Sequence, residues 1–229
     1  MADFFQSGLF FVVLTLLAYQ VGLLCQRKFR SPIFNPILIA VILVLIFLKV
    51  TGISVVDYQA GNARISWLMT PATVCLAIPM YEQFQILKKN IRAILAGVAC
   101  GAISSLVIVF LLAVCFGFDR MLTVSLLPKS VTSAIGAPIS AISGGIASVT
   151  TAAIILSGIL ANVLSLYLFR LFRLTNPIAK GVALGTSGHV IATTKGNEIS
   201  PLVGAVSSLS LVAAGLLTAA VLPVLIQWM

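Results

Sequence analysis

Two stretches decide how this chain folds: residues 121–145, MLTVSLLPKSVTSAIGAPISAISGG, and residues 179–200, AKGVALGTSGHVIATTKGNEIS. Both are apolar enough to enter a lipid bilayer, yet both are rich in glycine, serine and threonine and contain lysine. Each precedes one long apolar segment, at about residues 146–169 and 202–228. Irregular backbone is tolerated at membrane depth only where protein buries it or where it lines a cavity. The two stretches therefore predict broken helices around a binding site.

The composition of the whole chain excludes a water-soluble protein. Hydrophobic residues make up 60% of the 229 positions and charged residues only 8%, whereas soluble domains carry about 25% charged residues. Four further apolar segments precede the broken stretches, at about residues 4–25, 35–50, 65–81 and 93–116. One crossing needs about 20 residues. We therefore expect an all-α integral membrane protein of one domain (residues 1–229), with about six full spans and two broken or re-entrant polar segments.

Some of the connecting sequence also has structural meaning. The segment at about 65–81 contains Pro71 and Pro79, so it cannot form an undisturbed helix. Residues 51–64 are polar and are expected to form a loop. Gly97 and Gly101 have the small-xxx-small spacing that lets membrane helices approach closely, although such spacings often arise by chance.

The net charge of +9 comes from short basic runs beside apolar segments, which is an orientation signal and does not predict nucleic-acid binding. If the runs at 27–30 and 88–92 are cytoplasmic, Asp57 and Asp119 lie outside. Arg170, Arg173 and Lys180 are cytoplasmic only if residues 121–141 enter the membrane and return. The second stretch then enters from the cytoplasmic side, which makes residues 119–173 and 178–229 candidate inverted repeats, as in a secondary transporter. Proline-kinked helices, whose Ser and Thr satisfy neighbouring carbonyls, are the alternative.

Polar side chains in the two stretches are the candidate substrate-binding residues. Lys129 is far from a clear membrane interface, where an ammonium group is costly and therefore indicates function, unless its side chain reaches a headgroup region. His189, the only histidine, is either a hydrogen-bonded structural group or a contact for substrate or protons. Lys195 either extends this polar cluster together with Thr193 and Thr194 or forms a solvated pair with Glu198. The full candidate set is Lys129, Ser130, Thr132, Ser133, Thr186, Ser187, His189 and Thr193.

The acidic residues argue against other activities. Asp3, Asp57, Glu82, Asp119 and Glu198 all fall in expected loops or at segment ends, so a cation antiporter, which needs buried carboxylates, is disfavoured. No catalytic or nucleotide-binding motif is present, so we expect neither an enzyme nor a bound cofactor or metal. A lysine and a histidine as the intramembrane ionisable groups favour an anionic substrate.

Three motifs make the chain similar to the LrgB/CidB family of membrane proteins, which includes the LrgB-like half of the plant plastid glycolate/glycerate transporter. Residues 71–83, PATVCLAIPMYEQ, resemble the family's PATVALAIPLYxQ; residues 127–133, LPKSVTS, resemble its PKSVTT segment; residues 185–195, GTSGHVIATTK, resemble its GTAxHxxGTA segment. The sequence departs from the pattern at Ser133-Ala134, Gly188 and Ala192, so no single member's substrate carries over.

The resemblance implies a multi-pass protein of the bacterial cytoplasmic membrane, with a small LrgA-like membrane protein as partner and a possible homo-oligomer. It also implies one of two functions. The first is a carrier of small organic anions such as pyruvate or glycolate. The second is a holin/antiholin-like protein that regulates murein hydrolases and lysis, which needs no selective site. Intramembrane Lys129 and His189 in two broken segments favour the carrier.

Overall fold

The computed structural model describes residues 8–29 and 35–227, all of whose regular elements are helices. Residues 4–7 and 228 of the expected first and last spans, and Arg30 of the first basic run, lie outside the described residues. Four described helices are long and apolar enough to cross a membrane, rather than the expected six. They are α2 (Gly8–Phe29), α8 (Phe84–Cys115), α11 (Ala147–Leu171) and α13 (Pro201–Gln227). The chain divides into two compact units, Met1–Cys75 and Leu76–Met229.

In the first unit, α2 packs against α3 (Pro36–Thr51), which has only 16 residues. Asn35 caps α3, because its side chain accepts hydrogen bonds from the amides of Ile37 and Leu38, and Gly52, with a φ of 70°, ends it. The expected loop at 51–64 is wrong in part, since it contains α4 (Val55–Gly61). The Ser54 hydroxyl caps α4 at the amide of Asp57 and donates to that carboxylate, an N-terminal signal that the sequence contains.

The two prolines divide the segment at 65–81, as predicted. It contains α5 (Ala63–Trp67), α6 (Met69–Cys75) and, in the second unit, α7 (Ala77–Glu82). A proline ring clashes with the carbonyl four residues earlier. Accordingly α5 ends four residues before Pro71, and α6 ends four residues before Pro79.

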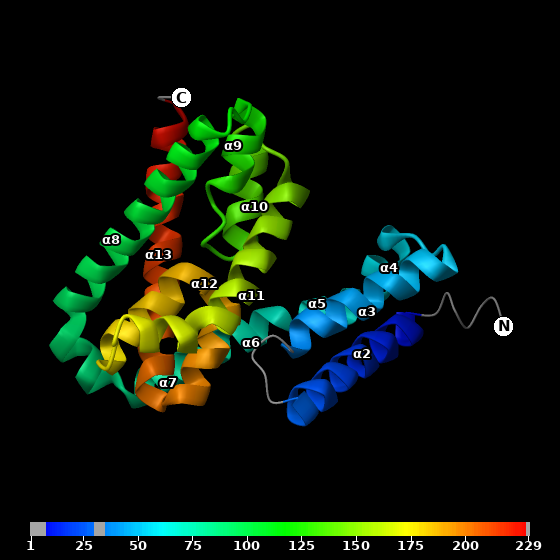
Figure 1. Cartoon of the computed structure of the whole chain (residues 1–229), viewed down its shortest axis with the longest axis horizontal. Helices are drawn as coiled ribbons and strands as arrows, with labels where there is room; N and C mark the ends of the chain where they lie inside the picture. Colours follow the sequence, from blue (N-terminus) through cyan, green and yellow to red (C-terminus); the bar gives the residue numbers. More distant parts are fainter. Residues whose placement is uncertain (1–7, 30–34, 228–229) are drawn as a thin grey trace. The chain divides into compact units, whose positions relative to one another are not determined.

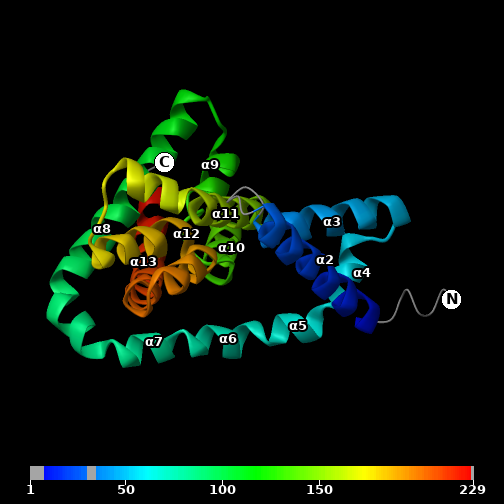
Figure 2. The same cartoon turned by 60° about the horizontal axis from the view of Figure 1, so that its bottom comes forward.

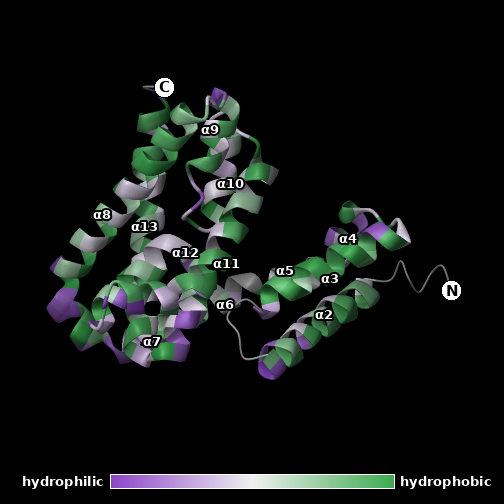
Figure 3. Cartoon of the chain, in the orientation of Figure 1, coloured by the Kyte–Doolittle hydropathy of each residue, from purple (hydrophilic) through white to green (hydrophobic). Residues whose placement is uncertain are grey.

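The described residues of the two basic runs lie at helix ends and not in loops. Arg27 and Lys28 belong to the last turn of α2, and Lys88, Lys89 and Arg92 lie within the first turns of α8. Lysine and arginine are good helix formers, and their long side chains reach a polar interface from inside a helix. Figure 3 shows hydrophilic residues at the end of the second unit where α8 begins.

The first broken stretch consists of α9 (Arg120–Leu126), a non-helical connection and α10 (Ser133–Ile142). The chain through α9 advances along α11: Ser125 accepts from the amide of Ile146, and the carbonyl of Lys129 accepts from Ser157. The chain then returns, because Gly136 lies against Ile154 and Ser140 bonds to Thr150, nearer the start of α11. The first half thus runs parallel to α11 and the second half antiparallel.

The second broken stretch is α12 (Pro177–Ile199), which bends at His189, where φ is 42° and ψ is −136°. Before the bend, Gly181 lies against Val206 and Gly185 against Ser210, so this half runs parallel to α13. After the bend, Thr193 bonds to Ser207 and Gly196 lies against Gly204, so this half runs antiparallel to α13. The halves of the two broken stretches therefore have the same relation to the long helix that follows.

Small residues allow α12 to lie among α8, α11 and α13, as Figures 1 and 2 show. Gly97 and Gly101 of α8 face Val182 and Thr186, so the small-xxx-small spacing is a real packing surface. A methyl group on Gly185 would come within 2.4 Å of the backbone oxygen of Ser207. After the bend, α12 runs parallel to α11, because Ile191 and Thr194 both contact Asn162 and Ile191 also lies beside Gly158. It follows that α11 and α13 run in opposite directions.

Candidate functional site

Lys129 lies in the connection between α9 and α10 and is half-buried. Pro128 and the following turn end α9 and keep the chain out of helical geometry, which projects the lysine between helices. Its ammonium group donates to Ser130 Oγ at 3.1 Å and approaches Ser105 Oγ of α8 at 3.5 Å. The two hydroxyl oxygens are 2.8 Å apart. One cation and two hydroxyls thus meet at one point.

This point forms the inner end of a cavity of about 960 Å³ in the second unit. Its walls are α8 from Asn90 to Ile108, α11 from Leu160 onward, and α12 from its N-cap Asn176 to Ser187. Because α8 and the first half of α12 run in parallel, Asn90 and Asn176 mark the same outer end. The walls are mainly apolar, and among the residues that the structure describes no acidic side chain contributes to them.

Six basic residues are close in the sequence to residues that line the outer end of the cavity. They neighbour the lining residues Asn90, Phe172 and Ala179 and are Lys88, Lys89, Arg92, Arg170, Arg173 and Lys180. A cluster of cations with few acids raises the local concentration of anions at a cavity mouth. An anion is therefore favoured both at the mouth and at the inner end.

The structure brings together half of the predicted site residues. Lys129 and Ser130 line the inner end, and Thr186 and Ser187 line the wall formed by α12. Thr132 precedes the first residue of α10 without capping it by its side chain, Ser133 begins that helix, and neither is part of the cavity wall. Thr193 is fully buried against α13, where it donates to the carbonyl of His189 and pairs with Ser207.

Sequence reasoning missed the contribution of α8. Ser104 and Ser105 line the cavity, and Ser105 pairs with Ser130. Both lie near the middle of a largely apolar span, and this pair of adjacent serines was the sequence feature that could have predicted their place in the site. The face that they occupy is decided by the packing of Gly97 and Gly101 against α12.

The position of His189 favours the first of its two interpretations, a hydrogen-bonded structural group. The side chain is only 4% exposed and does not line the cavity. Its Nε2 donates to the carbonyl oxygen of Ile154 at 2.9 Å, and the ring fills the space above Gly158. His189 is therefore not part of the cavity that Lys129 lines, because its ring points at α11.

The two breaks nevertheless meet at one turn of α11. Ser157 donates to the carbonyl of Lys129 at 2.7 Å and also lies 2.9 Å from the carbonyl of Ile154, which accepts from His189. Carbonyls and hydroxyls of α11 thus satisfy polar groups of both interrupted segments, as buried irregular backbone requires. The tips of both broken stretches are held near the middle of this helix.

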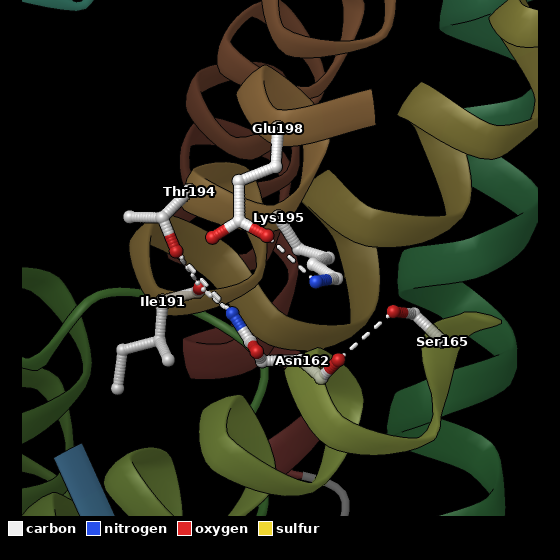
Figure 4. A network of polar contacts seen from close by, with 6 residues as sticks. All are labelled: Asn162, Ser165, Ile191, Thr194, Lys195 and Glu198. Carbon is white, nitrogen blue, oxygen red and sulfur yellow. Dashed lines mark hydrogen bonds and ion pairs between the residues drawn. The ribbon is translucent and has the colours of Figure 1, made fainter. Parts of the chain in front are cut away.

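A second polar cluster lies on the other side of α12, after the bend. Figure 4 shows Asn162 reaching the carbonyl of Ile191 at 2.7 Å and the hydroxyl of Thr194 at 3.3 Å. Beside it Lys195 and Glu198 form the predicted ion pair at 2.6 Å, with side chains 20% and 60% exposed. An exposed pair of this kind adds little stability, and Lys195 is thereby compensated in charge, unlike Lys129.

These features define a class: a multi-pass, all-helical membrane protein whose two broken helices meet beside a cavity suited to an anion. Among the described residues no cluster of His, Cys, Asp or Glu could hold a metal ion. The chain belongs to the LrgB-like family, whose family model matches residues 15–228.

Relatives cover nearly the whole chain. The chain is 36% identical over 222 residues to the antiholin-like protein LrgB of Bacillus subtilis, which covers 96% of both chains. It is also 36% identical over 215 residues to antiholin-like proteins LrgB of Bacillus cereus and Bacillus anthracis, covering 93% of this chain and 94% of theirs. No solved structure matches.

Proposed function

We propose that this protein is a membrane carrier for small organic monocarboxylates. The observation that carries the proposal is the cavity that leads from a basic outer end to Lys129, with no acidic residue in its walls. At its inner end one carboxylate oxygen can replace the contacts between the lysine and the two serines, and Ser105 and Ser130 can donate to the other oxygen. Pyruvate, glycolate and lactate suit so few polar contacts.

The arrangement of the second unit supports a carrier mechanism. We interpret residues 119–173 and 178–229 as inverted repeats whose polar tips enter the membrane from opposite faces. The parallel and antiparallel halves of both broken stretches, and the opposite directions of α11 and α13, support this interpretation. The cavity then opens at the cytoplasmic face, where basic residues gather. Single cysteines at Phe118 and Thr175 should react from opposite faces of the membrane, and labelling of both from one face would contradict the repeat.

Holin- or antiholin-like regulation of lysis is the second candidate, and the names of the relatives favour it. The alternatives make different demands on the structure. A lysis regulator needs no selective site, whereas the carrier needs the contacts at Lys129. An LrgA-like small membrane protein fits both, as does assembly into a homo-oligomer in the bacterial cytoplasmic membrane.

Reconstitution into liposomes tests the proposal. We expect saturable uptake of labelled pyruvate, glycolate or lactate, with an entrapped fluorescent dye retained. The measurement is made with and without the LrgA-like partner, and protein-free liposomes are the control. Release of the dye together with non-saturable uptake would support a pore, and uptake equal to that of protein-free liposomes under both conditions would refute the carrier.

A further inference from the structure

The passage beyond Lys129 is closed, and the structure shows what closes it. The hydrogen bond between Ser105 and Ser130 lies at the inner end of the cavity. Behind it is a void of about 10 Å³, whose walls include Ser105, Ser130, Thr186 and Thr218. A void of this size is at the lower limit of what can hold one water molecule. The void continues the line of the cavity, because both spaces share the first three of these residues.

An apolar seal lies next to this void, on the side away from the basic end. It consists of Leu106 and Val109 of α8, Leu222 and Ile226 of α13, and Val124 and Leu127 from the first broken stretch. All six side chains are buried. Leu106 and Leu127 also line the void, so the seal and the void are continuous.

Helix α11 is hydrogen-bonded on two sides: to the first broken stretch, where Ser157 donates to the carbonyl of Lys129, and to α12, through Asn162 and His189. Two hydroxyl pairs join helices away from α8: Ser140 to Thr150 between α10 and α11, and Thr193 to Ser207 between α12 and α13. Helix α8 packs on α12 and α13 through apolar contacts and through glycine contacts such as that of Gly101 with Thr186. The pair Ser105–Ser130, by contrast, joins α8 to the first broken stretch.

We propose that the contact of the first broken stretch with α8 and α13 is the closed gate of the carrier, and that the Ser105–Ser130 hydrogen bond is its latch. This inference rests on the proposed carrier function. Apolar side chains can separate and repack without leaving buried polar groups unsatisfied, whereas the bond between the two hydroxyls is directional and specific to the closed position. Opening the gate would connect Lys129 with the face opposite the basic end.

A crosslink tests the gate. In protein whose four cysteines (Cys25, Cys75, Cys100 and Cys115) are replaced by alanine, the double variant S105C/S130C should form a disulfide on mild oxidation. Because Ser105 and Ser130 also contact the substrate, the same double variant in its reduced state is the reference. On oxidation its uptake should fall at least about tenfold, and with reductant it should return to the level of the reduced variant, because a closed gate blocks every turnover.

Two matched pairs serve as controls. The hydroxyl oxygens of Ser140 and Thr150 are 2.7 Å apart, and those of Thr193 and Ser207 are 2.8 Å apart, close to the 2.8 Å of the latch. The variants S140C/T150C and T193C/S207C lock α10 to α11 and α12 to α13, away from the contact with α8, and should leave uptake unchanged. Full uptake by crosslinked S105C/S130C, or failure of that pair to crosslink, would overturn the gate.

A second measurement is independent of transport. A single cysteine at position 105 should react with an impermeant thiol reagent added at the basic face. It should also react with reagent added at the opposite face, but more slowly, because that reaction requires the gate to open. Ser130→Ala removes one hydrogen bond of the closed state and should raise the rate from the opposite face about fivefold. Reaction from the basic face alone, with and without Ser130→Ala, would overturn the gate. If the rate rises but the parent protein shows no uptake, the gate stands and the carrier function fails.

Discussion

Replacement of Lys129 by glutamine should lower the affinity for a carboxylate substrate by about ten- to a hundredfold. The ammonium group lies at the inner end of the cavity, with two serine hydroxyls as its hydrogen-bond partners and no acidic residue in the cavity walls. A carboxylate that binds there gains a charge-assisted hydrogen bond in a site with little competing water, worth about 1–3 kcal/mol. This energy corresponds to the expected change in affinity.

Two further variants make the measurement specific. Lys129→Arg keeps the charge but changes the donor geometry, so it should retain part of the function. Lys180→Gln removes a cation from the mouth, where the charge is more exposed and salt screens it, so its effect should be small. Substrate binding and uptake are compared in proteins that elute alike in size-exclusion chromatography. Wild-type affinity and rate in Lys129→Gln would show that the lysine does not bind the substrate.

Replacement of His189 by alanine should destabilise the protein by about 2–4 kcal/mol. The ring is buried against Gly158 and donates to the carbonyl of Ile154, so its loss removes a hydrogen bond and leaves a cavity. The backbone at His189 has a φ of 42° and a ψ of −136°, a conformation that only glycine adopts without strain. Alanine keeps that strain and loses the contacts that offset it.

His189→Gly is the matched control, because it removes the same ring and hydrogen bond but relieves the backbone strain. We therefore expect it to be more stable than His189→Ala by about 1 kcal/mol or more. Thermal unfolding of the detergent-solubilised proteins at one scan rate gives the order of stability. If the glycine variant unfolds at or below the temperature of the alanine variant, the strain does not contribute.

The gate does not depend on His189, since the ring contacts α11 away from the cavity walls. Both breaks, however, share the turn of α11 that contains Ile154 and Ser157. Movement of the first broken stretch must therefore preserve or exchange the bond between Ser157 and the carbonyl of Lys129.

The sequence by itself determined the class of protein and the places where its helices break. A chain with 60% hydrophobic and 8% charged residues suits a membrane protein, and it has too few charged residues to cover the surface of a soluble fold. Proline, glycine, serine and threonine act locally on the backbone, so the interruptions after Leu126, at His189 and before Pro71 and Pro79 were predictable. Lys129 was predictable for a similar reason, since an ammonium group far from an interface is costly wherever it lies.

Tertiary structure alone decided which side chains meet. Ser105 belongs to the site because Gly97 and Gly101 pack α8 against α12 with that serine facing Lys129. The rotation of a helix about its axis cannot be inferred from its local composition. The same packing turned His189 toward Ile154 and away from the cavity, although its neighbours Thr186 and Ser187 line that cavity. The sequence around His189 does not show this orientation. Propensity acts within a few residues of the chain, whereas the orientation of a helix depends on the close contacts that its small residues allow with distant segments.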